Sequence, residues 1–284
     1  MNDTERLARV IARSGRASRR EAERLVTEGL VQVNGEVILH PGHPVSVGRD
    51  HIRVDGKPLP TPPPLAYYLL NKPRGYITTR SDPEGRDNVL QLAADLPVRV
   101  EPVGRLDINT EGALLLTNDG DLAHRLTHPS SKVPKRYVAK VWRVPTDETL
   151  ERVMRGVRLE DGVTAPCKAR VLSVTKSENA WVEITVTEGR NHLIRRLFAA
   201  VGHPVSKLRR ESFATISIRD LDRGLIRPLT GAEVERLRQI GEGEDPARAG
   251  HRTRYRPGYA RPKEKANKPL SRKKATLKIK RQAR

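Results

Sequence analysis

Apolar residues in the first sixty positions recur first at the spacing of helices and then at the spacing of strands. Between residues 7 and 26 they return every three or four positions, and a capping-box sequence at Ser18 opens the second of two expected helices. From residue 31 to 54 they alternate around Asn34-Gly35, a pair typical of a type I′ hairpin turn. We predict that residues 3–60 form one unit of two helices followed by a small sheet.

Three consecutive prolines separate this unit from a longer region of mixed spacing. Residues 61–64 are expected to form a stiff, extended linker. Beyond the linker, the pattern predicts strands over 65–70, 135–144 and 181–189 and helices over 146–157 and 191–202. Asn191 is the expected N-cap of the last helix. Because strands and helices mix without a strict β-α-β rhythm, we expect residues 65–240 to form an α+β domain on a mixed, largely antiparallel sheet with flanking helices.

Charge adds a third segment to this division. The chain has 284 residues, with 54 Lys+Arg against 34 Asp+Glu and a formal net charge of +20. Residues 248–284 alone hold 15 basic residues and one acid. Since they carry little apolar pattern, we expect residues 241–284 to be a disordered Lys/Arg-rich tail, either a nucleic-acid arm or a solubilising segment. So basic a protein is expected to meet a polyanion.

Several classes of protein find no support in the sequence. No apolar run approaches the roughly 18 residues of a membrane span, and the N-terminus lacks the apolar core of a signal peptide, so we expect a cytoplasmic protein. The single cysteine, Cys167, excludes an internal disulfide framework and a Cys-rich zinc site. Nucleotide-binding glycine motifs and the HExxH metal motif are absent. A Ser–His–Asp set stays open, although no GxSxG elbow occurs.

Two polar stretches of the longer domain are candidates for chemistry. In residues 104–112, an extended backbone would put Arg105 and Asp107 on one face, with Leu106 and Ile108 pointing into the core. A carboxylate at that position can act as a nucleophile or a base without a metal, although an isolated aspartate is more often a turn residue. Residues 188–192 come just before Arg195 and Arg196, an arrangement that suits a phosphate or is merely a surface cluster of arginines.

Tyr137 lies in a third candidate stretch, on the strand expected over 135–144. A tyrosine ring there either stacks on an unpaired base, as in many RNA-binding proteins, or belongs to the core.

The N-terminal unit resembles a known RNA-binding fold. Its segment ASRREAERLVTEGLVQVNGEVI, residues 17–38, is similar to the alpha-L motif shared with a ribosomal small-subunit protein. Arginines on the two expected helices could otherwise form an ordinary solvated face, but the resemblance favours contacts with phosphates. The candidate residues are Arg6, Arg9, Arg13, Arg16, Arg19 and Arg20.

Four ordered motifs of the longer domain resemble the pseudouridine synthases of the RsuA/RluB type. They are LLNKPRGYITT at 69–79, PVGRLDINTEGALLLTNDG at 102–120, KRYVAKV at 135–141 and EGRNHLIRRLFAAVGHPV at 188–205. The resemblance implies isomerisation of a uridine in ribosomal RNA without metal or cofactor. The basic tail favours the RluB branch, which acts on large-subunit RNA. The alternatives are the same reaction on small-subunit RNA and a non-catalytic ribosome assembly factor.

The resemblance also implies roles for individual residues. Asp107 falls on the essential aspartate, as nucleophile at C1′ or base at C2′; Tyr137 falls on the tyrosine that stacks on the target base, and Arg195 on the basic residue paired with the aspartate. Leu193 stands where the family usually has Gln. The expected partner is ribosomal RNA or an assembly intermediate, bound by a monomer. Further RNA contacts are expected from Lys72, Arg105, Lys135, Arg190, Arg196 and Arg210.

Overall fold

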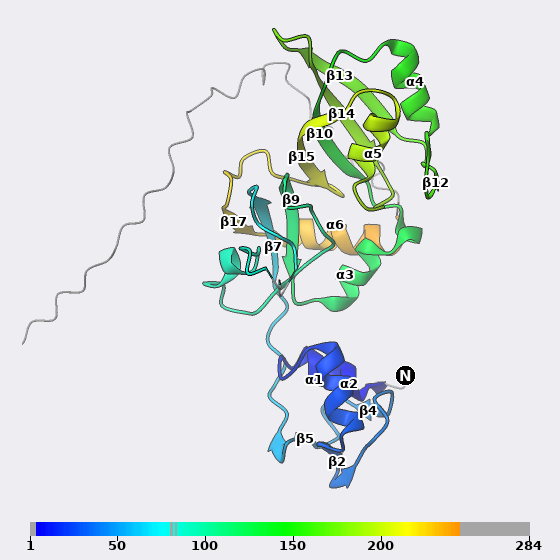
Figure 1. Ribbon diagram of the computed structural model, residues 1–284. Coiled ribbons are helices and arrows are strands. Elements are labelled where there is room, and N and C mark those ends of the chain that lie inside the picture. The colour runs from blue at the N-terminus through cyan, green and yellow to red at the C-terminus, as the bar shows by residue number, and fades with distance from the viewer. Residues whose placement is uncertain (1–3, 80–81, 83, 245–284) are drawn as a thin grey trace, which may run out of the picture. The chain divides into compact units, whose positions relative to one another are not determined.

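The computed structural model describes residues 4–79, 82 and 84–244, and the tail predicted from residue 241 lies, from residue 245 onward, outside the described residues (Figure 1). The helices are α1 (Leu7–Arg13), α2 (Arg19–Thr27), α3 (Gly120–Thr127), α4 (Asp147–Arg155), α5 (Leu193–Ala200) and α6 (Gly231–Gly241), with 3-10 turns at Gln91–Ala93 and Pro129–Ser131. No described helix is long and apolar enough to cross a membrane.

Except for one short strand before α1, the N-terminal elements follow the predicted order of two helices and then strands. The short strands are β1 (Thr4–Arg6), β2 (Val31–Val33), β3 (Glu36–Val37), β4 (Pro44–Ser46), β5 (Ile52–Val54) and β6 (Lys57–Pro58). Asn34 and Gly35 both have positive φ, 53° and 92°, as a type I′ turn requires. Ser18 caps α2 by accepting the N–H of Glu21 at 3.2 Å, but the carboxylate of Glu21 bonds to Arg24, so only half of the predicted capping box forms.

A mixed sheet of nine strands organises the second domain. Its strands are β7 (Tyr67–Lys72), β8 (Glu101–Pro102), β9 (Thr110–Thr117), β10 (Lys135–Val141), β13 (Lys168–Val174), β14 (Ala180–Val186), β15 (Val205–Phe213), β16 (Ile216–Ser217) and β17 (Ile226–Pro228), and β11 (Arg158–Leu159) with β12 (Gly162–Val163) forms a separate hairpin. The main path runs β13-β14-β10-β15-β9-β7-β17, and its pairings are antiparallel except for β15 beside β9. The predicted α+β class with a largely antiparallel sheet is confirmed.

The parallel pair of β9 and β15 depends on a glycine. Gly112 lies opposite Arg210 and has φ 114°. A Cβ atom at this position would lie 2.1 Å from the Arg210 carbonyl oxygen. The close approach of the two backbones therefore needs both the absent side chain and the conformational freedom of glycine.

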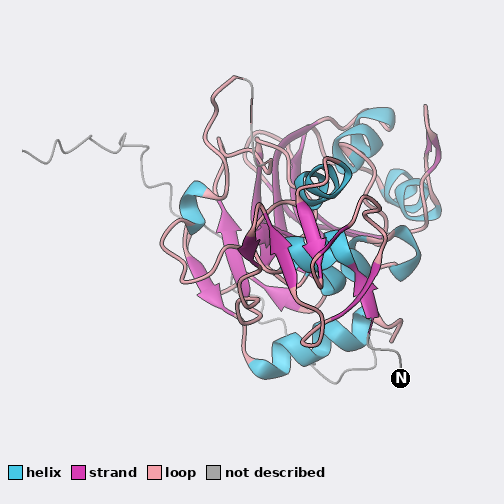
Figure 2. Cartoon of the chain, turned by 90° about the horizontal axis from the view of Figure 1, so that it is seen from below, coloured by secondary structure: helices cyan, strands magenta, loops and turns pink. Residues whose placement is uncertain are grey.

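Helices cover different faces of the two halves of the sheet. On β14, Val182 and Ile184 are buried beneath α4 and α5, whereas the residues between them are partly exposed. On β9, residues 113 and 115 pack toward α3 and α6, and residues 114 and 116 pack into a separate cluster with Leu106. Figure 2 shows the chain from below, with the strands of the sheet in magenta and the helices in cyan. The half containing β9 is thus buried on both sides, and the half containing β14 on one.

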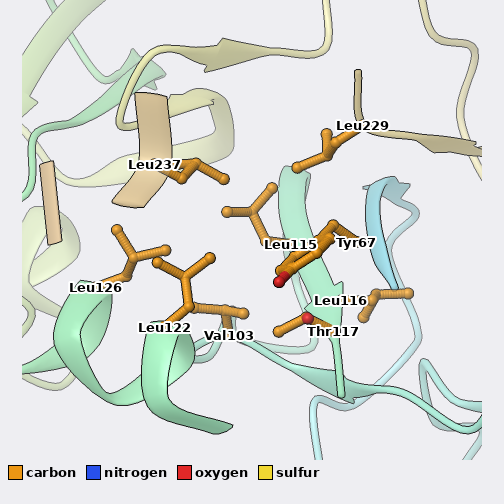
Figure 3. A pocket seen from close by; sticks show the side chains of 9 residues that line it. All are labelled: Tyr67, Val103, Leu115, Leu116, Thr117, Leu122, Leu126, Leu229 and Leu237. Atoms are coloured by element: carbon orange, nitrogen blue, oxygen red, sulfur yellow. The ribbon is translucent and has the colours of Figure 1, made fainter. Parts of the chain in front are cut away.

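A small apolar pocket lies within the cluster between β9, α3 and α6 (Figure 3). Leucines from these three elements line it, together with Tyr67 and Thr117 at its polar end. The Tyr67 hydroxyl donates to Asp119 at 2.8 Å. None of the nine lining residues is a predicted site residue, so the pocket is a packing gap of the core.

Two local predictions are wrong. Residues 103–109 form a loop and turn between β8 and β9, so Arg105 to Asp107 do not lie on a strand, and Ile108 is only half-buried. The N-cap of α5 is His192, with φ 51° and no side-chain cap bond, so Asn191 does not cap the helix. In both places the chain turns more tightly than its apolar pattern indicates.

Candidate active site

Asp107 lies in the loop that enters β9, and hydrogen bonds fix the backbone around it. The Thr110 N–H donates to the Asp107 carbonyl at 2.9 Å, and the Gly75 N–H donates to the Ile108 carbonyl, also at 2.9 Å. Thr78 both donates to and accepts from the backbone of Leu106, at 2.5 and 3.2 Å. The Asp107 side chain is 31% exposed. The loop is therefore held firmly while its carboxylate stays accessible to a substrate.

Lys72 lies beneath this loop at the end of β7. Its side chain is fully buried, and its ammonium donates to the carbonyls of Pro73, Asp107 and Thr110 at 3.0, 3.2 and 3.0 Å. Burial lowers the pKa of Lys72 to about 8, against the opposing effect of the Asp107 charge. Because no face of this side chain reaches solvent, the predicted RNA contact of Lys72 is wrong, and the residue instead anchors the loop.

Arg195 reaches the loop from the first turns of α5. Its guanidinium donates to the carbonyls of Asn109 and Val205 at 3.3 and 3.2 Å. The structure thus brings Arg195 to the Asp107 loop as expected, but through a backbone carbonyl, and it makes no ion pair with the Asp107 carboxylate within the described part of the chain.

Two side chains contact the Asp107 carboxylate: one is Thr110, whose hydroxyl donates to Oδ2 at 3.4 Å, and the other is His192. Its Nε2 lies 3.5 Å from Asp107 Oδ1, and the left-handed backbone at His192 points the ring toward the loop. We assigned His192 no separate role from the sequence. Its place in the motif just before Arg195 was the available signal. A histidine here can carry a positive charge beside the carboxylate or exchange a proton with it.

Tyr137 lies on β10 at the border of two core clusters. Its ring packs against the cluster under α5 and against the cluster that contains Leu106, the neighbour of Asp107. The side chain is only half-buried. A ring placed between the core and the Asp107 loop can pack on a base delivered to the carboxylate.

Two further predicted RNA-binding residues donate hydrogen bonds to backbone carbonyls. Arg210 is 2% exposed, donates to the Ala113 carbonyl at 2.7 Å and lies over the Phe213 ring. Lys135 donates to the carbonyls of Val133 and Thr187, and burial lowers its pKa to about 8. The Arg210 prediction is wrong because the side chain is enclosed between strands, whereas the RNA contact of the half-buried Lys135 stays a prediction.

The remaining basic residues near α5 differ in how freely they could meet a phosphate. Asp161 in the β11–β12 hairpin accepts from Arg190 at 2.9 Å and from Arg196 at 2.8 Å. These bonds fasten the hairpin beside the N-terminus of α5. Arg105, in contrast, is exposed and makes no side-chain bond to another described residue.

The predicted arginines of the N-terminal unit are all at least partly exposed. Arg13 pairs with Glu5 at 2.6 Å, and Arg16 pairs with Asp55 at 3.2 Å. Arg9 is also paired, with Glu5 at 3.6 Å. Exposed arginines without a partner among the described side chains are Arg6, Arg19 and Arg20. Within residues 4–79, 82 and 84–244, no group of three or more His, Cys, Asp or Glu side chains could hold a metal ion.

Comparison with known proteins adds independent information to this geometry. Residues 66–200 match the family described as RNA pseudouridylate synthase, and residues 5–50 match the S4 domain. Over 239 residues the chain is 47% identical to the ribosomal large subunit pseudouridine synthase B of Bacillus subtilis, covering 84% of this chain and 97% of that protein.

Two further matches agree. A ribosomal large subunit pseudouridine synthase B of Xylella fastidiosa is 41% identical over 248 residues, covering 82% of this chain and 51% of that protein. A crystal structure of a pseudouridylate synthase is similar with a TM-score of 0.59 and 30% identity, covering 82% of this chain and 99% of that one. The chain therefore belongs to the RNA pseudouridylate synthase family and is an enzyme that isomerises uridine in RNA to pseudouridine.

Proposed function

We propose that this enzyme modifies one uridine of large-subunit ribosomal RNA and that Asp107 is its catalytic carboxylate. The observation that carries the residue assignment is the loop of Asp107, which is bonded on several sides while its carboxylate stays 31% exposed. The substrate assignment rests on the relatives of Bacillus subtilis and Xylella fastidiosa, whose names specify the large subunit.

The reaction rearranges the uridine without adding or removing any atoms. The N1–C1′ bond breaks, the uracil turns, and a C5–C1′ bond forms, while C5 loses a proton and N1 gains one. Atoms and electrons balance within the RNA, so the reaction consumes no oxidant, reductant or other co-reactant. Asp107 would attack C1′ as a nucleophile or take the proton at C2′ as a base. His192, 3.5 Å from the carboxylate, would hold it in position.

The uridine must leave its stack before a side chain can reach its sugar. Extrusion of a base costs a few kcal/mol. Tyr137, half-buried beside the Leu106 cluster, would stack on the extruded uracil and so offset part of that cost. Arg195, which fixes the Asn109 carbonyl, would act by holding the loop.

The other predictions fit this scheme. We propose that residues 3–60 bind RNA, residues 61–64 link the units, residues 65–240 catalyse the reaction and residues 241–284 tether phosphates. The same scheme has the enzyme act as a monomer. A bacterial ribosomal RNA substrate would place the enzyme in the cytoplasm.

The substitution Asp107→Asn tests the catalytic assignment. We expect it to abolish tritium release from C5-labelled uridine in a large-subunit transcript while RNA binding is kept, since only the ionisable oxygen is lost. Asn109→Asp serves as the matched control, because its exposed side chain lies in the same loop and only its backbone carbonyl is used. If the activity of Asp107→Asn were within about tenfold of the wild-type activity, Asp107 would not be the catalytic carboxylate. Tritium release by the wild-type enzyme from small-subunit RNA alone would refute the assignment of large-subunit RNA as the substrate.

A further inference from the structure

Both tryptophans of the chain lie on the sheet face that α4 and α5 leave open. On β14 the residues Trp181 and Glu183 alternate with buried core residues, so they point away from the two helices. Trp181 lies opposite Lys140 of β10. Trp142 extends that strand, because its N–H donates to the Pro204 carbonyl at 3.0 Å, and alternation puts its ring on the side of Lys140. The chain contains two Trp in all.

These aromatic side chains are not part of the core. Neither tryptophan belongs to a hydrophobic cluster of the described residues, and Trp142 is 50% exposed. The Arg143 guanidinium lies 4.1 Å from the centre of the Trp142 ring. Arginine over a tryptophan face orders the ring by a cation–π contact and leaves it at the surface. Tryptophan, with a large apolar ring and a polar N–H, is enriched at binding interfaces.

Basic side chains surround the two rings. The same face, with the turn after β10, carries Arg136, Lys140, Arg143, Arg170, Lys207 and Arg209. Three described acids oppose them: Glu183 lies between Arg136 and Arg170, at 3.7 and 2.8 Å, Glu211 pairs with Arg209, and Glu111 of β9, opposite Arg209, pairs with Arg223. The face therefore keeps a surplus of positive charge, and the exposed Lys207 lies beside Lys140.

We propose that this open sheet face, defined by Trp142, Trp181, Lys140 and Lys207, binds a second, single-stranded segment of the RNA substrate. Aromatic side chains interleaved with basic ones provide base stacking and phosphate contacts together, the combination by which proteins hold single strands. Tyr137 points to the opposite side of β10, toward α5 and the Asp107 loop. The segment bound here is thus distinct from the one that carries the target uridine. The inference rests on the RNA substrate of the proposed function.

The position of the tryptophans permits a direct test. Since the chain has no tryptophan elsewhere, its emission at selective excitation reports on this face and not on the Asp107 loop. The full-length protein is titrated with a short oligouridylate and with a large-subunit transcript, and emission, total binding and uridine conversion are measured on the same samples. We expect both RNAs to quench the emission saturably and high salt to reverse the quenching.

Variants separate contact from a remote effect. Trp142→Ala should weaken oligouridylate binding about fivefold or more, the loss expected for one base–aromatic stack. Lys140→Gln with Lys207→Gln should lower the slope of log affinity against log salt by about 1.4, for two single-strand phosphate contacts. Arg152→Gln is the control, because it removes an exposed charge from α4 on the other side of these strands. It should change neither value.

Each outcome addresses one assignment. Unchanged emission with RNA that is bound and converted would overturn the sheet-face proposal and leave the proposed function intact. Quenching without conversion would support the face and count against the function. Emission that responds to ribosomal proteins but not to RNA would identify a protein-binding face and refute the RNA assignment. Equal effects of Arg152→Gln and the double lysine variant would likewise overturn it, since the contacts would then be unspecific.

Discussion

Replacing Lys72 by Met should destabilise the Asp107 loop, although the Lys72 ammonium bonds to backbone carbonyls and not to the Asp107 carboxylate. The change removes a buried ammonium that donates to three carbonyls within 3.2 Å. Each carbonyl left without a donor costs about 1–3 kcal/mol. Removing the buried charge returns about 3 kcal/mol, the equivalent of a pKa lowered from 10.5 to about 8. We expect a net loss of about 3 kcal/mol of unfolding free energy.

Activity should respond as well as stability. If most of that loss falls on the arrangement of the loop, kcat should drop by about a hundredfold. Urea unfolding and tritium release on the same preparation measure the two effects. Lys176→Met, at an exposed turn, is the control. A Lys72→Met protein with wild-type stability and kcat within about threefold of wild type would refute the anchoring role.

The pH dependence of stability gives a second measure of the same lysine. Its pKa of about 8 in the folded protein lies below the ordinary 10.5, so the unfolded chain binds more protons between these values. Stability from this group therefore rises as the pH increases through that window and is lost again on return to pH 8. The stability gap between wild type and Lys72→Met should widen by about 3 kcal/mol between pH 8 and 10.5. A constant gap would contradict the burial argument.

Three other perturbations have expected outcomes. Gly112→Ala should destabilise by several kcal/mol in urea unfolding, because its Cβ would overlap the Arg210 carbonyl; a loss below about 1 kcal/mol would show that the strands can separate. Tyr137→Ala should weaken binding of a substrate stem-loop by about 1–3 kcal/mol while Tyr137→Phe keeps affinity, as filter binding can show; equal affinity of all three proteins would make the tyrosine structural. Removing residues 248–284, with 15 basic residues, should flatten the salt dependence of RNA binding and raise KM, whereas parallel salt plots would exclude phosphate contacts.

Much of the fold can be predicted from the sequence, because the spacing of apolar residues matches the residues that are buried in the structure. The alternation along β14 and the helical stripe of α5 are both observed, and Asn34-Gly35 forms its hairpin turn. The loop at 103–109 was misread because Leu106 and Ile108 have the two-residue spacing of a strand, although only Leu106 is buried and the backbone is irregular. Local periodicity carries no information about that difference.

The site was predicted less completely than the fold. Asp107, Tyr137 and Arg195 do gather around one loop, but their partners depend on segments far apart in sequence. Lysine is ordinarily a surface residue, so nothing local marks Lys72 as buried. Arg195 meets a backbone carbonyl, and backbone groups have no residue signature. His192 reaches Asp107 only because its own backbone is left-handed, which sequence spacing does not reveal.

The parallel pairing of β9 with β15 has a consequence for how the enzyme is made. β7 and β9 are antiparallel neighbours that a growing chain can join early, with Lys72 already opposite Gly112. β15 lies almost a hundred residues downstream, and contacts of such long separation form slowly. Arg195 and His192, which complete the surroundings of Asp107, also emerge late in synthesis. A nascent chain thus carries its carboxylate beside a finished strand pair but stays catalytically incompetent until the last strands have been translated.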